Sequence, residues 1–297
     1  MHNISVIGCG NWSEKIISEI EKNKFFRLEN IVCRNKKKNI NFKINKLNKI
    51  EELFCKKNIG SVYVAALPDV NLEVIKYAKV NKIPLILEKP ISNSYQDSLE
   101  LIKIARENEI IVLPNMTNYF SECFSELEKF IKYNYEKIYK IIIFEGSYGP
   151  FRDKIHPIWD WGFHSISTLV NLFRYENFSN IIHKEIKKNN RVNGNISKFS
   201  FTIDNKINVK IITGNLFKKK RRVLKIYLKS NEILINDMVN HKLFFNEKEI
   251  YSSKKSNLNF LLDIFNLSIL KKNLSLSQKL LDNSAKTTKI LENFYKY

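Results

Sequence analysis

The chain has 297 residues and a formal net charge of +20 at pH 7. This length predicts two domains, each large enough to bury a hydrophobic core of its own. Although 44% of the residues are hydrophobic, no apolar run reaches the ~20 residues of a membrane-spanning helix, and no basic segment followed by an apolar core indicates a secretory signal. We therefore expect a cytoplasmic protein with no membrane partner.

Positive charge is spread along the chain rather than gathered in one stripe. Its densest runs are Lys36–Lys38 and Lys218–Arg222, and the second lies between two strand-like segments, where we expect a solvated hairpin end. The chain is also rich in Lys, Asn and Ile, the residues of AT-rich codons, so a coding bias explains the charge without a nucleic-acid partner. We expect no nucleic-acid binding, while a basic surface can help to gather an anionic substrate.

The four cysteines are scattered and include no C-x-x-C pair. Cys9, Cys33, Cys55 and Cys123 show no spacing typical of a disulfide framework. We expect them to be reduced, mostly buried thiols.

The first part of the chain alternates strand-like and helix-like segments, which predicts an N-terminal Rossmann domain with a doubly wound parallel sheet. The expected strands are 4–7, 27–33, 61–66, 84–88 and 110–113. The expected helices are 13–22, 47–57, 70–81 and 95–107, the last with a capping box from Ser94 to Asp97.

The pattern changes after Pro114, and the remainder predicts a C-terminal α+β domain with an open, mostly antiparallel sheet. Consecutive strands joined by short turns fill residues 180–252. The other expected elements are helices at 121–132, 163–173, 258–270 and 276–295, a strand at 138–145 and a loop at 146–161. We place the domains at residues 1–118 and 119–297.

A glycine-rich turn follows the first expected strand. Gly8-Cys9-Gly10 stands between the apolar segment 4–7 and a helix, as a dinucleotide-binding turn requires. The first glycine permits the tight turn, the second lets the backbone approach a pyrophosphate, and the helix N-terminus offers free N–H groups. The third glycine of the usual motif is replaced by Ser13. The expected cofactor contacts here are Gly8, Gly10, Asn11 and Trp12.

The end of the second strand bears on the choice between NAD and NADP. An acidic residue usually stands here to bind the ribose hydroxyls of NAD, but this chain has Arg34 followed by lysines. A cation can meet the 2′-phosphate of NADP, so we expect NADP(H) to be favoured over NAD(H). The alternative is that Arg34 stacks on the adenine and discriminates little.

Two further segments produce a family resemblance. Glu88-Lys89-Pro90 follows the fourth expected strand, and Asp160-x-x-x-His164 lies within Trp159–His164. With the Gly-x-Gly-x-Trp opening, these motifs resemble the glucose–fructose oxidoreductase / inositol dehydrogenase / MocA (Gfo/Idh/MocA) family of NAD(P)-dependent oxidoreductases over nearly the whole chain. The resemblance implies a final helix that returns to the nucleotide domain. The Trp-Asp-Trp-Gly-x-His form is similar to short members found in sugar-nucleotide and surface-polysaccharide pathways.

Lys89 is the first expected catalytic residue. Ligands of a doubly wound sheet bind beyond the carboxyl ends of its strands, where Lys89 falls. There it can hold the substrate oxygen and stabilise developing negative charge, whereas the alternative is an ordinary surface lysine. By the same reasoning Leu67, Pro68, Glu88 and Lys89 are expected to contact the cofactor. Pro90 can make the Lys89–Pro90 peptide cis, although a trans bond is the default expectation.

Asp160 and His164 are the other expected catalytic residues. Four residues apart, they share one face of a helix. Oxidation of an alcohol requires the hydroxyl proton to leave, and histidine titrates near neutral pH, so His164 is expected to carry that proton. Asp160 would orient the substrate or tune the charges on His164 and Lys89. The alternative is a helix-capping Asp160 and a structural His164.

Several other side chains are weaker candidates. His156, Asp160 and His164 recur at four-residue intervals, but Pro157 argues against one unbroken helix, so we expect no metal site. Tyr119, Arg152 and Trp161 are expected substrate contacts, although each can equally serve packing.

The sequence therefore predicts an enzyme, a dehydrogenase or ketoreductase of a sugar or nucleotide-linked sugar, that forms a homodimer or homotetramer through its open sheet. Two alternatives remain open. One is reduction of a C=N bond or a non-sugar ketone on the same fold. The other is a non-catalytic NAD(P)-binding sensor or scaffold, which would have no need of Lys89, Asp160 and His164 together.

Overall fold

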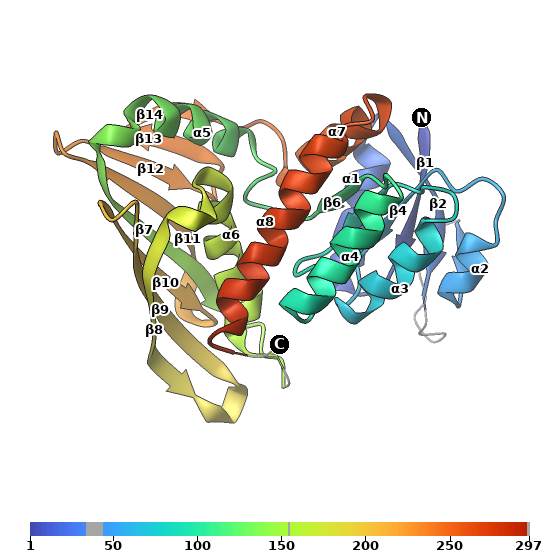
Figure 1. Cartoon of the computed structure of the whole chain (residues 1–297), viewed down its shortest axis with the longest axis horizontal. Helices are drawn as coiled ribbons and strands as arrows, with labels where there is room; N and C mark the ends of the chain where they lie inside the picture. The colour runs from blue at the N-terminus through green and yellow to red at the C-terminus, as the bar shows by residue number, and fades with distance from the viewer. Residues whose placement is uncertain (34–43, 154, 296–297) are drawn as a thin grey trace. The chain divides into compact units, whose positions relative to one another are not determined.

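The computed structural model describes residues 1–33, 44–153 and 155–295 (Figure 1). The chain forms two compact units. The first unit comprises Met1–Asn115 and Asn257–Thr288, and the second comprises Met116–Ser256 and Lys289–Tyr297. The two units are described in turn.

The first unit contains a six-stranded sheet in the order β3-β2-β1-β4-β5-β6, in which every neighbouring pair is parallel. This order reverses direction between β1 and β4, so their carboxyl ends flank the topological switch point where such sheets bind ligands. The sheet confirms the predicted doubly wound fold. Its strands are β1 (His2–Ile7), β2 (Phe26–Val32), β3 (Asn45–Leu47), β4 (Ser61–Val64), β5 (Leu85–Leu87) and β6 (Val112–Pro114).

Helices cover this sheet, and β4 and β5 are buried along their whole length, as parallel strands covered on both faces are. Ser94 Oγ accepts the Asp97 N–H at 3.0 Å, which confirms the predicted cap of α4. In Figure 1, α3 and α4 lie side by side. The helices of this unit are α1 (Asn11–Lys22), α2 (Ile50–Phe54), α3 (Asp69–Ala78), α4 (Tyr95–Glu107), α7 (Asn257–Leu270) and α8 (Leu274–Glu292).

One predicted helix is shorter than expected. Residues 47–57 were predicted to be helical, but Leu47 closes the edge strand β3, and α2 spans only Ile50–Phe54. The edge strand is three residues long and pairs with β2 alone, so its local pattern is too short to be told from the start of a helix.

The second unit contains an eight-stranded sheet in the order β14-β13-β12-β11-β7-β10-β9-β8. All neighbours are antiparallel except β10 and β7, which are parallel, so the prediction of a mostly antiparallel sheet is confirmed. The strands are β7 (Ile138–Tyr148), β8 (Phe178–Asn189), β9 (Gly194–Ile203), β10 (Ile207–Gly214), β11 (Leu216–Leu228), β12 (Ile233–Asp237), β13 (Lys242–Phe245) and β14 (Lys248–Ser252).

Three helical segments of this unit matter for the site: α5 (Glu122–Asn134), the π-helix η2 (Ile158–Gly162) and α6 (Phe163–Leu172). Short 3₁₀ turns lie at Tyr135–Lys137, Tyr175–Asn177 and Asn190–Val192. Both ends of the loop predicted at 146–161 are regular secondary structure, because β7 continues to Tyr148 and η2 begins at Ile158.

The basic run Lys218–Arg222 was predicted to form a hairpin end. That prediction is wrong, because the run lies within β11. The register of β11 against β7 shifts between Leu216 and Arg221, so residues 217–220 form an irregular insertion in the strand, called the bulge below. The three lysines are exposed, but the two arginines are engaged: Arg221 lies 3.6 Å over the ring of Phe144, and Arg222 pairs with Glu145 at 2.8 Å. Charge on this strand is thus partly structural.

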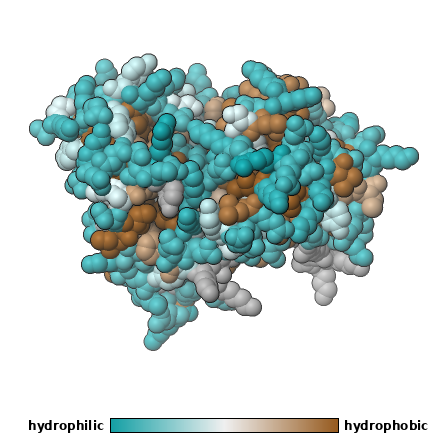
Figure 2. Space-filling model, viewed as in Figure 1, coloured by the Kyte–Doolittle hydropathy of each residue, from teal (hydrophilic) through white to brown (hydrophobic). Residues whose placement is uncertain are grey.

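The surface agrees with a polar exterior. On the face shown in Figure 2, hydrophilic residues predominate and hydrophobic residues form smaller patches. Among the residues that the structure describes, none of the helices combines the length and hydropathy needed to cross a membrane.

The prediction of reduced cysteines is wrong for two of the four. Cys9 and Cys33 form a disulfide with their Cα atoms 5.4 Å apart. The pairing follows from the sheet: β1 and β2 are parallel neighbours that pair Ile7 with Val32, and Gly8 N donates to Val32 O at 2.9 Å. Residues 24 positions apart in the chain therefore meet just beyond the two strands. Cys55 is free and exposed, and Cys123 is free and buried.

Reduction of this disulfide should destabilise the first unit. A cross-link over a loop of this size contributes about 3 kcal/mol in the chain-entropy model. We expect a lower melting temperature with a phosphine reductant, and a Cys9→Ser/Cys33→Ser double variant that melts at the reduced temperature whether or not reductant is present. Thiol titration of the denatured, unreduced chain should find two of four thiols reactive; four reactive thiols would contradict the pairing.

Candidate functional site

The turn after β1 has the geometry that a dinucleotide pyrophosphate requires. Gly8 has φ +120°, and a Cβ there would lie 2.3 Å from the carbonyl oxygen of Ala65, just beyond β4. A Cβ on Gly10 would meet nothing within 4 Å. Gly8 is therefore needed for the fold of the switch point, whereas the space beside Gly10 is open to a ligand.

The start of α1 completes this turn. Gly10 is the N-cap of the helix, and as a glycine it has no side chain to cap the first N–H groups. Ser13, which replaces the third glycine, is buried, and its hydroxyl makes no hydrogen bond to the residues that the structure describes. An uncapped helix N-terminus beside a glycine that leaves open space fits a phosphate-bearing cofactor.

A half-buried carboxylate, that of Glu88, ties this turn to neighbouring strands. Glu88 Oε1 accepts hydrogen bonds from Trp12 Nε1 at 2.7 Å, Tyr63 OH at 2.8 Å and Asn115 Nδ2 at 2.7 Å. Burial raises the pKa of Glu88, and the three donors oppose that shift. Burial also holds the pKa of Tyr63 well above its usual value. Trp12, 39% exposed, is thereby fixed beside the glycine turn.

Tyr63 and Asn115 were missed by the sequence reasoning. Tyr63 stands in the apolar strand β4, and Asn115 directly follows β6. A polar group in or just after an apolar parallel strand is the available signal, because such a strand ends at the ligand-binding edge of the sheet.

Lys89 follows Glu88 at the carboxyl end of β5 and is partly exposed, while Pro90 is buried. The Lys89–Pro90 peptide is cis, not trans as the default expectation had it. Leu67, 53% exposed, and Pro68, the N-cap of α3, follow β4. The expected cofactor contacts thus leave adjacent strands at one edge of the sheet. Arg34 lies outside the described residues.

Asp160 and His164 of the second unit were expected to share one α-helix, but they do not. Asp160 lies in the π-helix η2, and α6 begins at Phe163, one residue before His164. Asp160 Oδ2 accepts a hydrogen bond from Arg152 Nε at 2.8 Å. The Nδ1 atom of His164 lies 3.4 Å from Thr117 Oγ1, a partner that the sequence did not suggest. Single π turns inside helices are frequent at functional sites.

Trp161 and Tyr119, two other expected substrate contacts, have partners within the second unit. Trp161 Nε1 donates to Gly149 O at 3.2 Å. The Tyr119 ring packs 5.1 Å from the ring of Phe120 and 5.0 Å from that of Phe124, and burial raises its pKa to about 12. These contacts place both side chains in the second unit without deciding whether they touch substrate.

His156 has partners other than Asp160. Its ring stacks on Tyr295 at 3.7 Å between centroids, and its Nε2 lies 3.4 Å from Glu185 Oε1. Burial lowers the pKa of His156, which favours the neutral imidazole. In the described part of the chain, no group of three or more His, Cys, Asp or Glu side chains is arranged to hold a metal ion.

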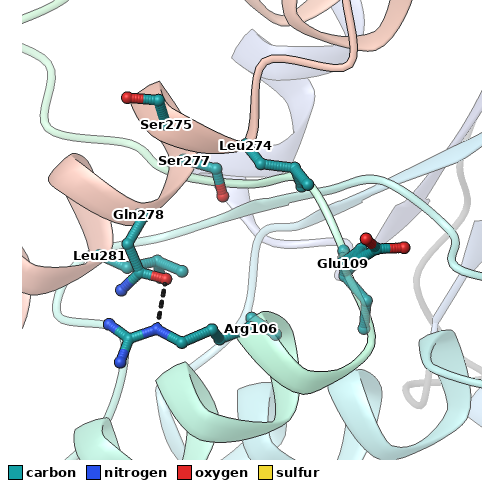
Figure 3. Close-up of a pocket in the computed structure, with 9 residues that line it drawn as sticks. Arg106, Glu109, Leu274, Ser275, Ser277, Gln278 and Leu281 are labelled. Carbon is teal, nitrogen blue, oxygen red and sulfur yellow. Dashed lines mark hydrogen bonds between the residues drawn. The ribbon is translucent and has the colours of Figure 1, made fainter.

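A cavity of about 280 Å³ opens elsewhere in the first unit, between the end of α4 and the start of α8 (Figure 3). Arg106 Nε donates to Gln278 Oε1 at 3.0 Å across it. None of the residues predicted for cofactor or substrate lines this cavity. Arg106 is also 3.7 Å from Asp282, so its charge is already balanced.

The parallel sheet, its switch point and the uncapped helix after Gly8-x-Gly10 define a dinucleotide-binding Rossmann unit. Residues 2–116 match the family described as oxidoreductases with an NAD-binding Rossmann fold. This match places residues 2–116 with the Gfo/Idh/MocA family of NAD(P)-binding oxidoreductases, and solved oxidoreductases share the fold of the chain.

Similar proteins extend the likeness to the whole chain at the level of fold. A 3-ketoreductase from Actinomadura kijaniata in complex with NADP has a TM-score of 0.82 at 12% identity, covering 98% of this chain and 97% of that one. A UDP-N-acetylglucosamine 3-dehydrogenase from Acidithiobacillus ferrooxidans has a TM-score of 0.81 at 12% identity, covering 99% and 98%.

Two proteins of Synechocystis are also similar. Biliverdin reductase, in complex with biliverdin and NADP⁺, has a TM-score of 0.72 at 14% identity, covering 98% of this chain and 97% of that one. An uncharacterized oxidoreductase is 31% identical over 68 residues, which are 23% of this chain and 18% of that relative. The matched segment therefore spans less than a fifth of the curated relative's length.

Two alanine variants separate the fold of the glycine turn from its binding role. Gly8→Ala should cost about 2–4 kcal/mol, because its Cβ meets the backbone and its φ is positive. Gly10→Ala should leave stability within about 0.5 kcal/mol but weaken NADPH binding by about tenfold or more, since its Cβ fills space left for the ligand.

Chemical denaturation and quenching of Trp12 fluorescence by NADPH measure the two quantities. Equal NADPH affinity in Gly10→Ala and the wild type would mean that the dinucleotide does not approach this turn.

Proposed function

We propose that the protein transfers a hydride to or from a carbon of a sugar or nucleotide-linked sugar, using NADP(H) in preference to NAD(H). The observation that carries this proposal is the position of Lys89. It follows Glu88 at the carboxyl end of β5, and Glu88 is hydrogen-bonded to Trp12 beside the glycine turn. A lysine at that edge of a Rossmann sheet stands where the reacting end of a dinucleotide belongs.

Each proposed catalytic side chain has a defined task. When bound, the dinucleotide supplies or takes up the hydride. Lys89 donates a hydrogen bond to the substrate oxygen and stabilises the negative charge that develops on it. His164 takes the hydroxyl proton during oxidation and returns it during reduction. Asp160, held by Arg152 at 2.8 Å, orients the substrate or tunes the charges on His164 and Lys89.

The preference for NADP(H) rests on the sequence after β2. Cys33 follows that strand and is bonded to Cys9, so no acidic side chain stands at the end of the strand to bind the ribose of NAD. Two proteins of similar fold are complexes with NADP or NADP⁺. Parallel fluorescence titrations with NADPH and NADH decide the preference, and equal affinities would withdraw it.

Reduction of a non-sugar substrate is the second candidate function. The specific observation in its favour is the similar fold of a biliverdin reductase, whose substrate is not a sugar. A fold shared at 14% identity does not determine substrate, so the panel of substrates should include both chemistries. A non-catalytic NAD(P)-binding sensor or scaffold is the least supported of the three functions, because such a protein would not need Lys89 or His164.

We expect Lys89→Ala and His164→Ala each to lower turnover at least about 100-fold, the usual scale for loss of a charge stabiliser or of a general acid–base. NADPH affinity should change little in either variant. The assay follows nicotinamide absorbance with a panel of sugars and nucleotide sugars, UDP-N-acetylglucosamine among them. Lys103→Ala, an exposed lysine of α4, is the matched control. Turnover at the wild-type rate in both catalytic variants would exclude these assignments.

We also propose a homodimer or homotetramer formed through the open face of the second unit's sheet. Ile141 and Ile143 of β7 are fully buried, whereas Ile142 and Phe144, on the other face, are only half-buried. Ile212, Val223 and Tyr227 on the neighbouring strands lie on the same partly exposed face, which also carries Lys210 and Lys225 beside Ile142. A surface of this kind is typical of a protein–protein interface.

Light scattering tests the oligomer. We expect a mass at least twice the 35.1 kDa of one chain, and replacement of Phe144 by Lys should lower it because a charge would be buried in the interface. A monomer of the wild type at micromolar concentration would contradict the proposal.

The proposal keeps a cytoplasmic location and no nucleic-acid or membrane partner. The positive charges are spread along the whole chain. On β11, Arg221 contacts Phe144 and Arg222 pairs with Glu145, which argues against a nucleic-acid-binding surface on this strand. The Cys9–Cys33 disulfide weighs against a strongly reducing compartment, so the location needs a direct test by cell fractionation.

A further inference from the structure

A buried ion pair lies at the end of β7 in the second unit. Glu145 is 0% exposed, and Arg222 of β11 is 16% exposed. Glu145 Oε1 accepts a hydrogen bond from Arg222 Nε at 2.8 Å, and Arg222 Nη2 lies 2.8 Å from the same oxygen. The same carboxylate accepts from Ser165 Oγ at 3.0 Å and from Asn118 Nδ2 at 3.2 Å. The carboxylate is thus held by donors from three separate segments.

Two of these segments lead to His164. Ser165 is the next residue on α6, so its bond to Glu145 anchors the first turn of that helix. Thr168 Oγ1 donates to His164 O at 2.7 Å and accepts from Asn118 Nδ2 at 3.0 Å. The main chain of His164 is therefore fixed from both sides of its own helix turn.

The segment that contains Asn118 leads to the imidazole ring of His164. Asn118 is held by Glu145, by Thr168 and by Arg222, whose Nη2 donates to Asn118 Oδ1 at 2.6 Å. The residue before it, Thr117, places Oγ1 3.4 Å from Nδ1 of His164. Fixing Asn118 therefore fixes the hydroxyl that faces the ring.

We propose that Glu145 is a positioning residue for His164. Through Asn118 it holds Thr117 so that Nδ1 of His164 donates its proton to Oγ1, and through Ser165 it holds the backbone of His164. This tautomer leaves the lone pair on Nε2 to exchange a proton with the substrate hydroxyl. The inference rests on the proposed role of His164 in proton transfer and adds the source of its orientation.

Arg222 makes this arrangement possible. A buried carboxylate without a cation is strongly unfavourable. The planar guanidinium donates to Glu145 and Asn118 at once, which a lysine ammonium cannot do in the same geometry. The bulge in β11 ends just before this residue, where the register with β7 resumes at Arg221.

The test reads the tautomer of His164 directly, by ¹⁵N–¹H correlation of the histidine rings at a pH well above the titration of each ring. Thr117→Val removes the hydroxyl at nearly constant shape, and Thr117→Ser retains it. We expect Nδ1–H to be the major form of His164 in the wild type and in Thr117→Ser. In Thr117→Val it should become the minor form, because a free imidazole prefers Nε2–H.

Glu145→Gln tests the positioning step itself. We expect the His164 tautomer to shift toward that of Thr117→Val, since Asn118 and Ser165 lose their charged acceptor. Glu145→Gln/Arg222→Gln removes both charges and replaces the single variant if an unpaired Arg222 prevents folding. Thr202→Val is the matched control. Thr202 lies on β9, and its hydroxyl is hydrogen-bonded to that of Ser179 on β8 at 2.8 Å, outside the network around Glu145.

Each outcome has a defined meaning. A shift in the Thr117 and Glu145 variants without a shift in Thr202→Val supports the inference. An unchanged His164 in Thr117→Val overturns the tautomer assignment, and an unchanged His164 in the folded Glu145 variant overturns the role of Glu145. A shift in Thr202→Val would show a general packing effect and would also overturn it. The rings are read without substrate, so failure of wild-type hydride transfer would reject the proposed function and leave this result standing.

Discussion

A carboxylate that is withdrawn from water needs donors around it, and each unit of this protein has one such group, half-buried in the first unit and fully buried in the second. In the first unit Glu88 accepts from Trp12, Tyr63 and Asn115 and so joins the start of α1 to strands β4 and β6. In the second unit Glu145 accepts from Arg222, Ser165 and Asn118. Both networks adjoin a residue proposed for catalysis, Lys89 in one case and His164 in the other.

The features that the sequence predicted well are those with a local signature. The Gly8-x-Gly10 turn, the alternating elements of the first unit and the cap at Ser94 are each encoded within a few residues. The order of the parallel strands follows because few topologies are compatible with that alternation.

The features that it missed join distant segments. Cys9 and Cys33 meet because β1 and β2 are neighbours, and Arg222 meets Glu145 across 77 positions. Neither pair has a motif. The placement of Arg222 also depends on a bulge in β11, which shifts the register and cannot be read from an alternating pattern.

The bulge in β11 divides the strand into an exposed basic stretch and a stretch that pairs with β7. Residues 221–228 keep a continuous register with β7 apart from one shift at Leu228, while the exposed lysines before them lie outside that register. Length and charge in the bulge can therefore vary without moving Arg222 from Glu145. The surface at this end of the sheet therefore tolerates substitution in residues 217–220, because the ion pair beneath it is set by the residues that follow.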